Sequence, residues 1–305
     1  MHAFRALSPR PRPSPSELDR RRLLLGLTAS ALGCARRASE ETPEPPPALA
    51  KTRLPVGFLA HGAPTLALDA ARGEPLRRWG RALPKPNAIL CISAHFESSP
   101  ISVEVGARPN LIYDFSGFPD ALYRVQYPAP GAPALAERVV SLLSSSEAVS
   151  RVERGFDHGV WVPLVHLFPE ADVPVVQVSL PAPGKPNQVV AMGRRLAPLR
   201  DEGILILGSG NLTHNLRRVD FSERSLPPAW ASEFDAWVAD ALERSAIDEL
   251  ADFRTRAPAH RLAHPSDEHF TPVLAVAAAA AGETVTYPVS GFEYGSLSRR
   301  SPQIG

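Results

Sequence analysis

Three histidines follow apolar runs that are typical of β-strands, and each lies close to the carboxyl end of its run. They are His61, His95 and His214. Because the carboxyl ends of parallel strands form the ligand crevice of an open α/β sheet, the three imidazoles are expected to meet at one edge. One histidine after a strand usually has a structural role, but three in equivalent places favour a metal site. A histidine site without cysteine suits iron or zinc.

A second group of histidines and acids lies between His264 and His269, just before an apolar helix predicted over 272–281. Ser266 or Asp267 could cap that helix, whose positive end favours acidic residues. Capping does not explain the two histidines, because a cation is disfavoured at a helix N-terminus. A neutral, metal-bound imidazole would be tolerated there, so this segment is expected to contribute to the site.

The remaining histidines outside the first fifty residues differ in what their surroundings favour. Asp157 is expected to cap a helix over 162–168, which would place His158 at the rim of the site. His166 lies on the apolar stretch of that helix and is expected to be a structural histidine. His260 lies in a polar stretch without supporting neighbours, so no role is assigned to it.

The elements that must position these side chains can be read from the apolar pattern. Short apolar runs flanked by turn residues predict strands buried on both faces, at 54–60, 88–94, 101–105, 173–180, 203–207 and 284–289. Helical patterns lie at 132–143, 162–168, 186–200, 229–242 and 272–281. This alternation predicts an α/β fold, a single domain with a central, mainly parallel sheet flanked by helices and the metal site at the carboxyl ends of the strands.

Composition excludes several classes of protein. The chain has 305 residues, of which 44% are hydrophobic, and a formal net charge of +1. That charge argues against a nucleic-acid partner, and no apolar run reaches the 18 residues of a membrane span. Cys34 and Cys91 are too few for a disulfide framework or a cysteine-rich zinc site. Small molecules are the expected partners, and the oligomeric state is left open.

Residues 1–34 are typical of a bacterial export signal. Arg20, Arg21 and Arg22 precede a short apolar stretch, as in twin-arginine signals, and the sequence from Ala31 to Cys34 resembles a lipobox with Cys34 as the lipidated residue. Residues 35–52 are rich in Pro and Glu and predict a flexible linker to a catalytic domain over 53–305. The expected location is the periplasm or a lipid anchor on the membrane; the alternative is a cytoplasmic protein.

With these residues in hand, the sequence resembles the class III extradiol ring-cleavage dioxygenases, in particular the 4,5-DOPA dioxygenase-like branch. The blocks that carry the resemblance run in order through nearly all of 54–305. They are Ala60–Pro64, Ser93–Phe96, Tyr113–Pro119, Gln126–Gly131, Phe156–Trp161, Gly208–Asn215 and Glu268–Phe270.

The resemblance implies cleavage of a DOPA-like catechol by O2 at a nonheme Fe(II). It implies His61, His95 and His269 as metal ligands, although the wider superfamily uses two histidines and a carboxylate, which leaves Glu268 as an alternative third ligand. His214 matches the acid/base histidine, which needs a pKa near the working pH. His158 would form a hydrogen bond with the substrate or with oxygen.

Two other functions remain open from the sequence. Zinc is the alternative metal, and an open histidine site that binds zinc can activate water, so a zinc-dependent hydrolase is the competing enzyme class. A surface lipoprotein that binds metal without catalysis is the third interpretation. Only the dioxygenase needs a redox-active iron and a diol substrate.

Overall fold

The computed structural model of the protein describes residues 53–221 and 226–305, which belong to one compact unit. The predicted export signal at 1–34 and the predicted linker at 35–52, Cys34 included, lie outside the described residues. Among the helices within these described ranges, none has the length and apolar character needed to cross a membrane.

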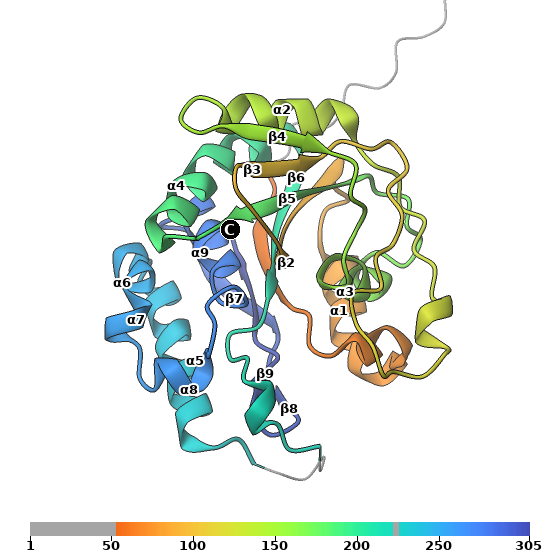
Figure 1. The fold of residues 1–305 in the computed structure, drawn as a ribbon. Coiled ribbons are helices and arrows are strands. Elements are labelled where there is room, and N and C mark those ends of the chain that lie inside the picture. Colours follow the sequence, from red (N-terminus) through yellow and green to blue (C-terminus); the bar gives the residue numbers. More distant parts are fainter. Residues whose placement is uncertain (1–52, 222–225) are drawn as a thin grey trace, which may run out of the picture. The chain divides into compact units, whose positions relative to one another are not determined.

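The centre of the fold is an eight-stranded sheet in the order β4-β3-β5-β2-β6-β1-β10-β7 (Figure 1). Its middle strands β5, β2, β6 and β1 are parallel to one another, whereas β10 runs antiparallel to both β1 and β7. The strands are β1 Val56–Ala60, β2 Ala88–Ser98, β3 Ile101–Glu104, β4 Val149–Val152, β5 Val175–Pro181, β6 Ile204–Gly210, β7 Val285–Val289 and β10 Ser301–Ile304. Strands β8 Phe292–Glu293 and β9 Leu297–Ser298 form a separate pair.

Helices cover both faces of this sheet, which confirms the predicted α/β class. Helices α1 and α3 pack on one face, and α2, α4, α5, α6 and α9 contribute to the core on the other (Figure 1). The helices are α1 Ala70–Ala82, α2 Pro133–Leu143, α3 His158–Leu167, α4 Pro186–Leu196, α5 Ala229–Glu243, α6 Ile247–Ala251, α7 Phe253–Arg256, α8 His260–Ala263 and α9 Pro272–Ala279.

Helix α9 packs against the sheet on the face that α2, α4, α5 and α6 also cover. All eight of its residues are buried, as its apolar pattern on every side predicts. It packs closely on α4 at Gly193, where an added Cβ would lie 2.1 Å from the carbonyl oxygen of Ala275. Only glycine allows the two helices to approach this closely.

Two predicted elements differ from the structure in their bounds. His95 was expected just past the end of a strand, but β2 continues to Ser98 and contains it. The pairing of β2 with β5 shifts register between Ile92 and Glu97, and such an irregularity redirects the side chains within it. The helix predicted over 186–200 ends at Leu196 and continues as a 3-10 helix over Ala197–Glu202.

Candidate metal centre

His61 directly follows the central strand β1 and points its free nitrogen into the site. The Ser209 hydroxyl on β6 donates to the carbonyl oxygen of Gly159, so it accepts a hydrogen bond from His61 Nδ1 at 2.9 Å. This chain of hydrogen bonds assigns the proton to Nδ1 and leaves Nε2 with a lone pair. The backbone turns directly after His61, because Gly62 has φ +61° and an added Cβ would lie 2.3 Å from Glu293 Oε1.

His95 and His269 complete a group of three imidazoles around one point. His95 Nε2 lies 3.3 Å from His61 Nε2, and the ring of His269 lies 5.3 Å from that of His61 and 4.9 Å from that of His95. One nitrogen from each of the three lies within 4.8 Å of the others. His61 follows β1 and His95 lies in β2, two parallel strands that flank β6 in the sheet, and His269 comes from the segment before α9.

The nitrogen that His269 presents to this group is left without a partner. Its Nδ1 donates to Glu268 Oε1 at 3.0 Å, which fixes the tautomer. Within the described part of the chain, His269 Nε2 is buried and has no hydrogen-bond partner. A buried, unsatisfied nitrogen is costly unless something fills its lone pair.

The electrostatics of the group favour neutral imidazoles. Burial, followed by the neighbouring histidines, holds the pKa of His61 and of His269 well below the usual range. Burial and the adjacent His158 lower the pKa of His95 to about 4. Metal ligands must be unprotonated, so three neutral nitrogens facing one another fit a divalent transition metal.

Glu268 was left open as an alternative third ligand. Its carboxylate accepts hydrogen bonds from His269 Nδ1 and, at 2.9 Å, from the Ser266 hydroxyl. Glu268 is close enough to His214 and His269 to form a second possible metal-binding group with them. The group beside β1 and β2, however, consists of His61, His95 and His269 and does not include Glu268. In this arrangement the Glu268 carboxylate orients the ring of His269.

His158 lies at the start of α3 and is paired with an acid for which the sequence assigned no role. Its backbone N–H and its Nδ1 both donate to Asp114 Oδ1, at 3.0 and 2.9 Å. Burial alone would raise the pKa of Asp114, but these hydrogen bonds outweigh it and lower that pKa to about 2. The ring of His158 lies 4.0 Å from that of His95 and lines the same cavity. Asp114 is brought here by a parallel bridge between Leu111 and Phe156.

The predicted capping role of Asp157 is wrong as regards its side chain. Asp157 does precede α3, but its buried carboxylate makes no cap hydrogen bond. It accepts instead from the Ser93 hydroxyl at 2.7 Å, from Arg154 at 2.9 Å and from Gln177. A buried carboxylate needs such donors, and here they join α3 to β2 and β5.

His214 faces the same cavity from the loop that follows β6. Its ring stacks on that of His269, with centroids 3.5 Å apart and planes inclined by 6°. The loop is held from behind, because His214 N donates to Ala263 O at 2.9 Å and His264 Nε2 donates to Leu212 O at 2.7 Å. Burial and then His264 lower the pKa of His214 to about 4, which lies below the value near the working pH that was expected for an acid/base histidine.

The other histidines of the described chain have structural partners. His264 was expected to contribute to the site, but it supports the His214 loop and packs against Phe234 and Phe270. His260 was assigned no supporting neighbours, yet it pairs with Asp267 at 2.9 Å. His166 is structural, as predicted, and bonds to Leu66 O at 2.7 Å.

The helix caps expected before α9 are also wrong. Thr271 occupies the cap position of α9, and neither Ser266 nor Asp267 caps this helix with its side chain. The Ser266 hydroxyl donates to Glu268, and the Asp267 carboxylate pairs with Arg254 at 2.6 Å as well as with His260. The segment is therefore ordered by its own ion pairs.

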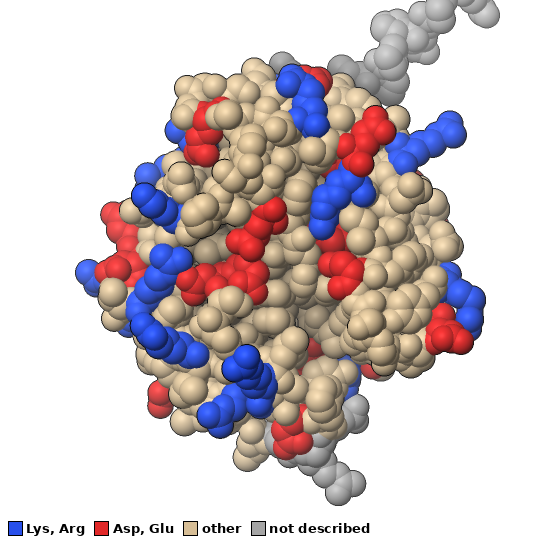
Figure 2. Space-filling view, viewed as in Figure 1, with Lys and Arg blue, Asp and Glu red and all other residues tan. Residues whose placement is uncertain are grey.

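One cavity of about 650 Å³, a volume within the range of small-molecule sites, is lined by five imidazoles. They are those of His61, His95, His158, His214 and His269. Around them the wall is formed by Gly62, Ala63, Pro64, Thr65, Asp114, Phe115, Phe118, Leu216, Val219, Phe221, Tyr294 and Leu297. On the face of the molecule shown in Figure 2, acidic and basic side chains are interspersed rather than gathered by sign.

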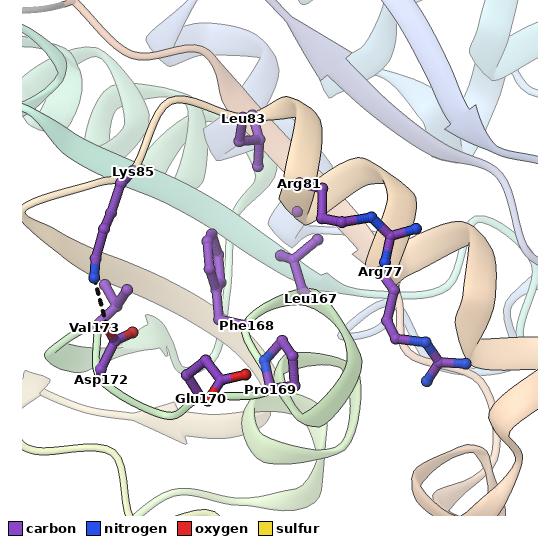
Figure 3. Close-up of a pocket in the computed structure, with 11 residues that line it drawn as sticks. Arg77, Arg81, Leu83, Lys85, Leu167, Phe168, Pro169, Glu170, Asp172 and Val173 are labelled. Carbon is purple, nitrogen blue, oxygen red and sulfur yellow. Dashed lines mark hydrogen bonds and ion pairs between the residues drawn. The ribbon is translucent and has the colours of Figure 1, made fainter.

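A second hollow of about 420 Å³ lies near the amino ends of β2 and β5, the opposite edge of the sheet (Figure 3). Four of its charged side chains form ion pairs with one another or with a neighbour: Lys85 with Asp172, and both Arg77 and Arg81 with Glu74. Its lining includes no histidine. The first cavity, in contrast, contains the neutral imidazoles of His61, His95 and His269, whose nitrogens face one another. We therefore take the first cavity as the candidate site.

Comparisons with known proteins give a consistent result. The family model described as the catalytic LigB subunit of aromatic ring-opening dioxygenase matches residues 64–299. A protein named 4,5-DOPA dioxygenase extradiol from Escherichia coli K12 is 41% identical over 263 residues, 84% of this chain and 97% of its own. One of the same name from Beta vulgaris is 43% identical over 233 residues, 74% of this chain and 86% of its own.

A solved structure is also similar. The crystal structure of the uncharacterized protein JW3007 from Escherichia coli K12 aligns with a TM-score of 0.71 at 37% identity. The alignment covers 83% of this chain and 100% of that one.

Proposed function

This chain belongs to the family of catalytic LigB subunits of aromatic ring-opening dioxygenases, and we propose that it opens the ring of a catechol with O2 at a nonheme Fe(II) held by His61, His95 and His269. Its membership makes it an extradiol ring-cleavage enzyme. Metal dependence is a property of the family, and the histidine cluster is where a metal would bind.

The observation that carries the proposal is the unpartnered Nε2 of His269. It is buried beside the facing Nε2 atoms of His61 and His95, and a cation among the three nitrogens would satisfy all of them. When bound there, iron would supply the redox step between catechol and dioxygen and would stabilise negative charge on the catechol oxygens.

The protein's own residues would handle the protons. His214 is buried and kept neutral by its surroundings, so its ring can accept a proton from a catechol hydroxyl. His158 donates from Nδ1 to Asp114, which leaves Nε2 as an acceptor for a second hydroxyl. These two histidines lie in the wall of the cavity beside the three proposed ligands, so a diol bound at those ligands would be within their reach.

The names of the relatives make L-DOPA the first catechol to test. Protein purified without oxygen and loaded with Fe(II) is expected to consume one O2 for each catechol and to form a yellow, ring-opened product. The zinc-loaded protein should be inactive. Turnover of ester or amide substrates by the zinc form, with no catechol cleavage by the iron form, would instead favour the zinc-dependent hydrolase.

A further inference from the structure

Two of the three proposed metal ligands have a hydrogen-bond acceptor on Nδ1, the nitrogen that faces away from the site. His61 Nδ1 donates to the Ser209 hydroxyl at 2.9 Å, and His269 Nδ1 donates to Glu268 at 3.0 Å. Such outer partners fix the ring and make the ligating nitrogen more basic. His95 also presents Nε2, which lies 3.3 Å from His61 Nε2, so its Nδ1 needs an equivalent partner.

The group that faces His95 Nδ1 is the carboxylate of Asp114. Its Oδ2 lies 3.7 Å from that nitrogen, just beyond hydrogen-bond distance. A metal on Nε2 withdraws electron density from the imidazole ring, which makes Nδ1–H a stronger donor towards a carboxylate. Asp114 is therefore placed to be the outer partner of His95.

The other oxygen of the same carboxylate binds His158. Asp114 Oδ1 accepts from the backbone N–H and from Nδ1 of His158, at 3.0 and 2.9 Å. Capping the first turn of α3 would need only the first of these bonds. The second fixes His158 with its proton on Nδ1 and a lone pair on Nε2. One carboxylate thus contacts both a proposed metal ligand and the proposed acceptor for a substrate hydroxyl.

The loop that carries Asp114 is tied to the segment that carries His158. Ile112 N donates to Phe156 O at 2.7 Å, and Trp161 Nε1 on α3 donates to Ile112 O at 3.1 Å. Phe156 and Trp161 are both fully buried. A carboxylate two residues from these contacts has little freedom to turn away from either histidine, as a side chain that orients others requires.

Building on the proposed function, we propose that Asp114 is a positioning residue that serves the metal and the substrate side of the site at once. Its Oδ2 accepts the Nδ1 proton of His95 when Nε2 of that ring binds the metal. Its Oδ1 holds His158 with Nε2 open to the substrate. Metal binding and proton transfer therefore depend on the same side chain.

Asp114→Asn separates the two roles. The amide oxygen can keep both hydrogen bonds from His158, which places the amide NH2 opposite His95 Nδ1–H, where a donor meets a donor. When the metal-free full chain is titrated with Zn(II) against a chelator, we expect Asp114→Asn to lose affinity by about 10- to 100-fold. His158→Ala should bind zinc as the parent protein does, because it keeps the carboxylate beside His95. Asp120→Asn, the same change at an exposed residue of the same loop, is the matched control.

NMR spectra of the ¹⁵N-labelled histidine rings in the zinc-loaded full chain give a readout that does not depend on turnover. In the parent protein we expect His95 and His158 to carry their protons on Nδ1, with the His95 proton moved downfield by its carboxylate acceptor. Asp114→Asn should lose this downfield signal and keep the His158 tautomer, whereas Asp114→Ala should release both rings. A general folding defect would not separate the two histidines.

The zinc affinities and the tautomers decide the role of Asp114 even if no catechol is cleaved and the proposed function fails. Parent-like zinc affinity in Asp114→Asn, or an equal loss of zinc in His158→Ala, would overturn the proposal. A His158 proton on Nε2 in the parent protein would overturn it without any variant. So would a second zinc ion that binds the parent protein and is lost in Asp114→Asn, because His95, Asp114 and His158 would then form a metal site of their own.

Discussion

Replacing Glu268 separates a metal ligand from a residue that orients one. Its carboxylate accepts the Nδ1 proton of His269 at 3.0 Å and thereby holds Nε2 towards His61 and His95. Removing such an outer partner typically weakens metal binding by about 10- to 100-fold, or about 1.4 to 2.7 kcal/mol. We therefore expect Glu268→Ala to bind metal within that factor of the parent protein, and Glu268→Gln, which keeps a carbonyl acceptor, to lose less.

His269→Ala should behave differently because it removes one of the three converging nitrogens. Its affinity should fall by at least a further factor of ten below that of Glu268→Ala. Metal-free protein would be titrated with Zn(II) against a chelator of known affinity, with circular dichroism to confirm folding. His260→Asn is the matched control, because His260 pairs with Asp267 outside the cluster.

The opposite order of affinities would refute this reasoning. If Glu268→Ala lost metal more completely than His269→Ala, the carboxylate would be the third ligand and the site would have two histidines and one acid. Equal, parent-like affinity in both variants would remove the segment before α9 from the metal site.

Four further predictions follow from the structure and the sequence. His214→Ala should keep its metal and its affinity for catechol but lose ring cleavage by about 10²–10⁴-fold, with partial recovery at higher pH; unchanged turnover would exclude His214 as the acid/base. Burial lowers the pKa of His264 to about 4, although its hydrogen bond to Leu212 O partly opposes this shift. Because the pKa of a histidine in the unfolded chain is about 6.5, the unfolded chain gains a proton first as the pH falls. His264 alone should therefore contribute about 3 kcal/mol to the loss of folding stability between these pH values, and urea titrations of His264→Phe should show a smaller loss than the parent protein. Gly193→Ala should cost about 1–3 kcal/mol in a thermal or urea denaturation because its Cβ would meet Ala275. Lysine in place of Arg20 and Arg21 should retain precursor in the cytoplasm on fractionation; unchanged export would contradict a twin-arginine signal.

The elements that could be predicted from the sequence are those whose own residues carry a periodic signal. Helix α9 is apolar on every side, and β1 and the first part of β2 are continuous apolar runs, so their burial followed directly. Strand β10 has no such run, because Ser301–Ile304 reads Ser-Pro-Gln-Ile. It is recognisable only through its partners β1 and β7.

The residues of the candidate site also divide into those that the local sequence could predict and those that it could not. His61 and His95 could be placed because the strand ends of a parallel sheet meet. Asp114 could not be placed, because its contact with His158 depends on a single bridge between two loops distant in sequence. The role of His264 depends on which carbonyl lies beside its ring, which no local pattern indicates.

The hydrogen bond between His61 and Ser209 has a consequence for how the protein is assembled. The two residues are 148 positions apart, and the Ser209 hydroxyl also binds Gly159 on a third segment. Contacts of such long sequence separation form late in folding, because the intervening chain must first lose its freedom. The three nitrogens are therefore expected to converge only once the sheet is complete, so metal uptake during refolding should report the last cooperative step rather than the first collapse.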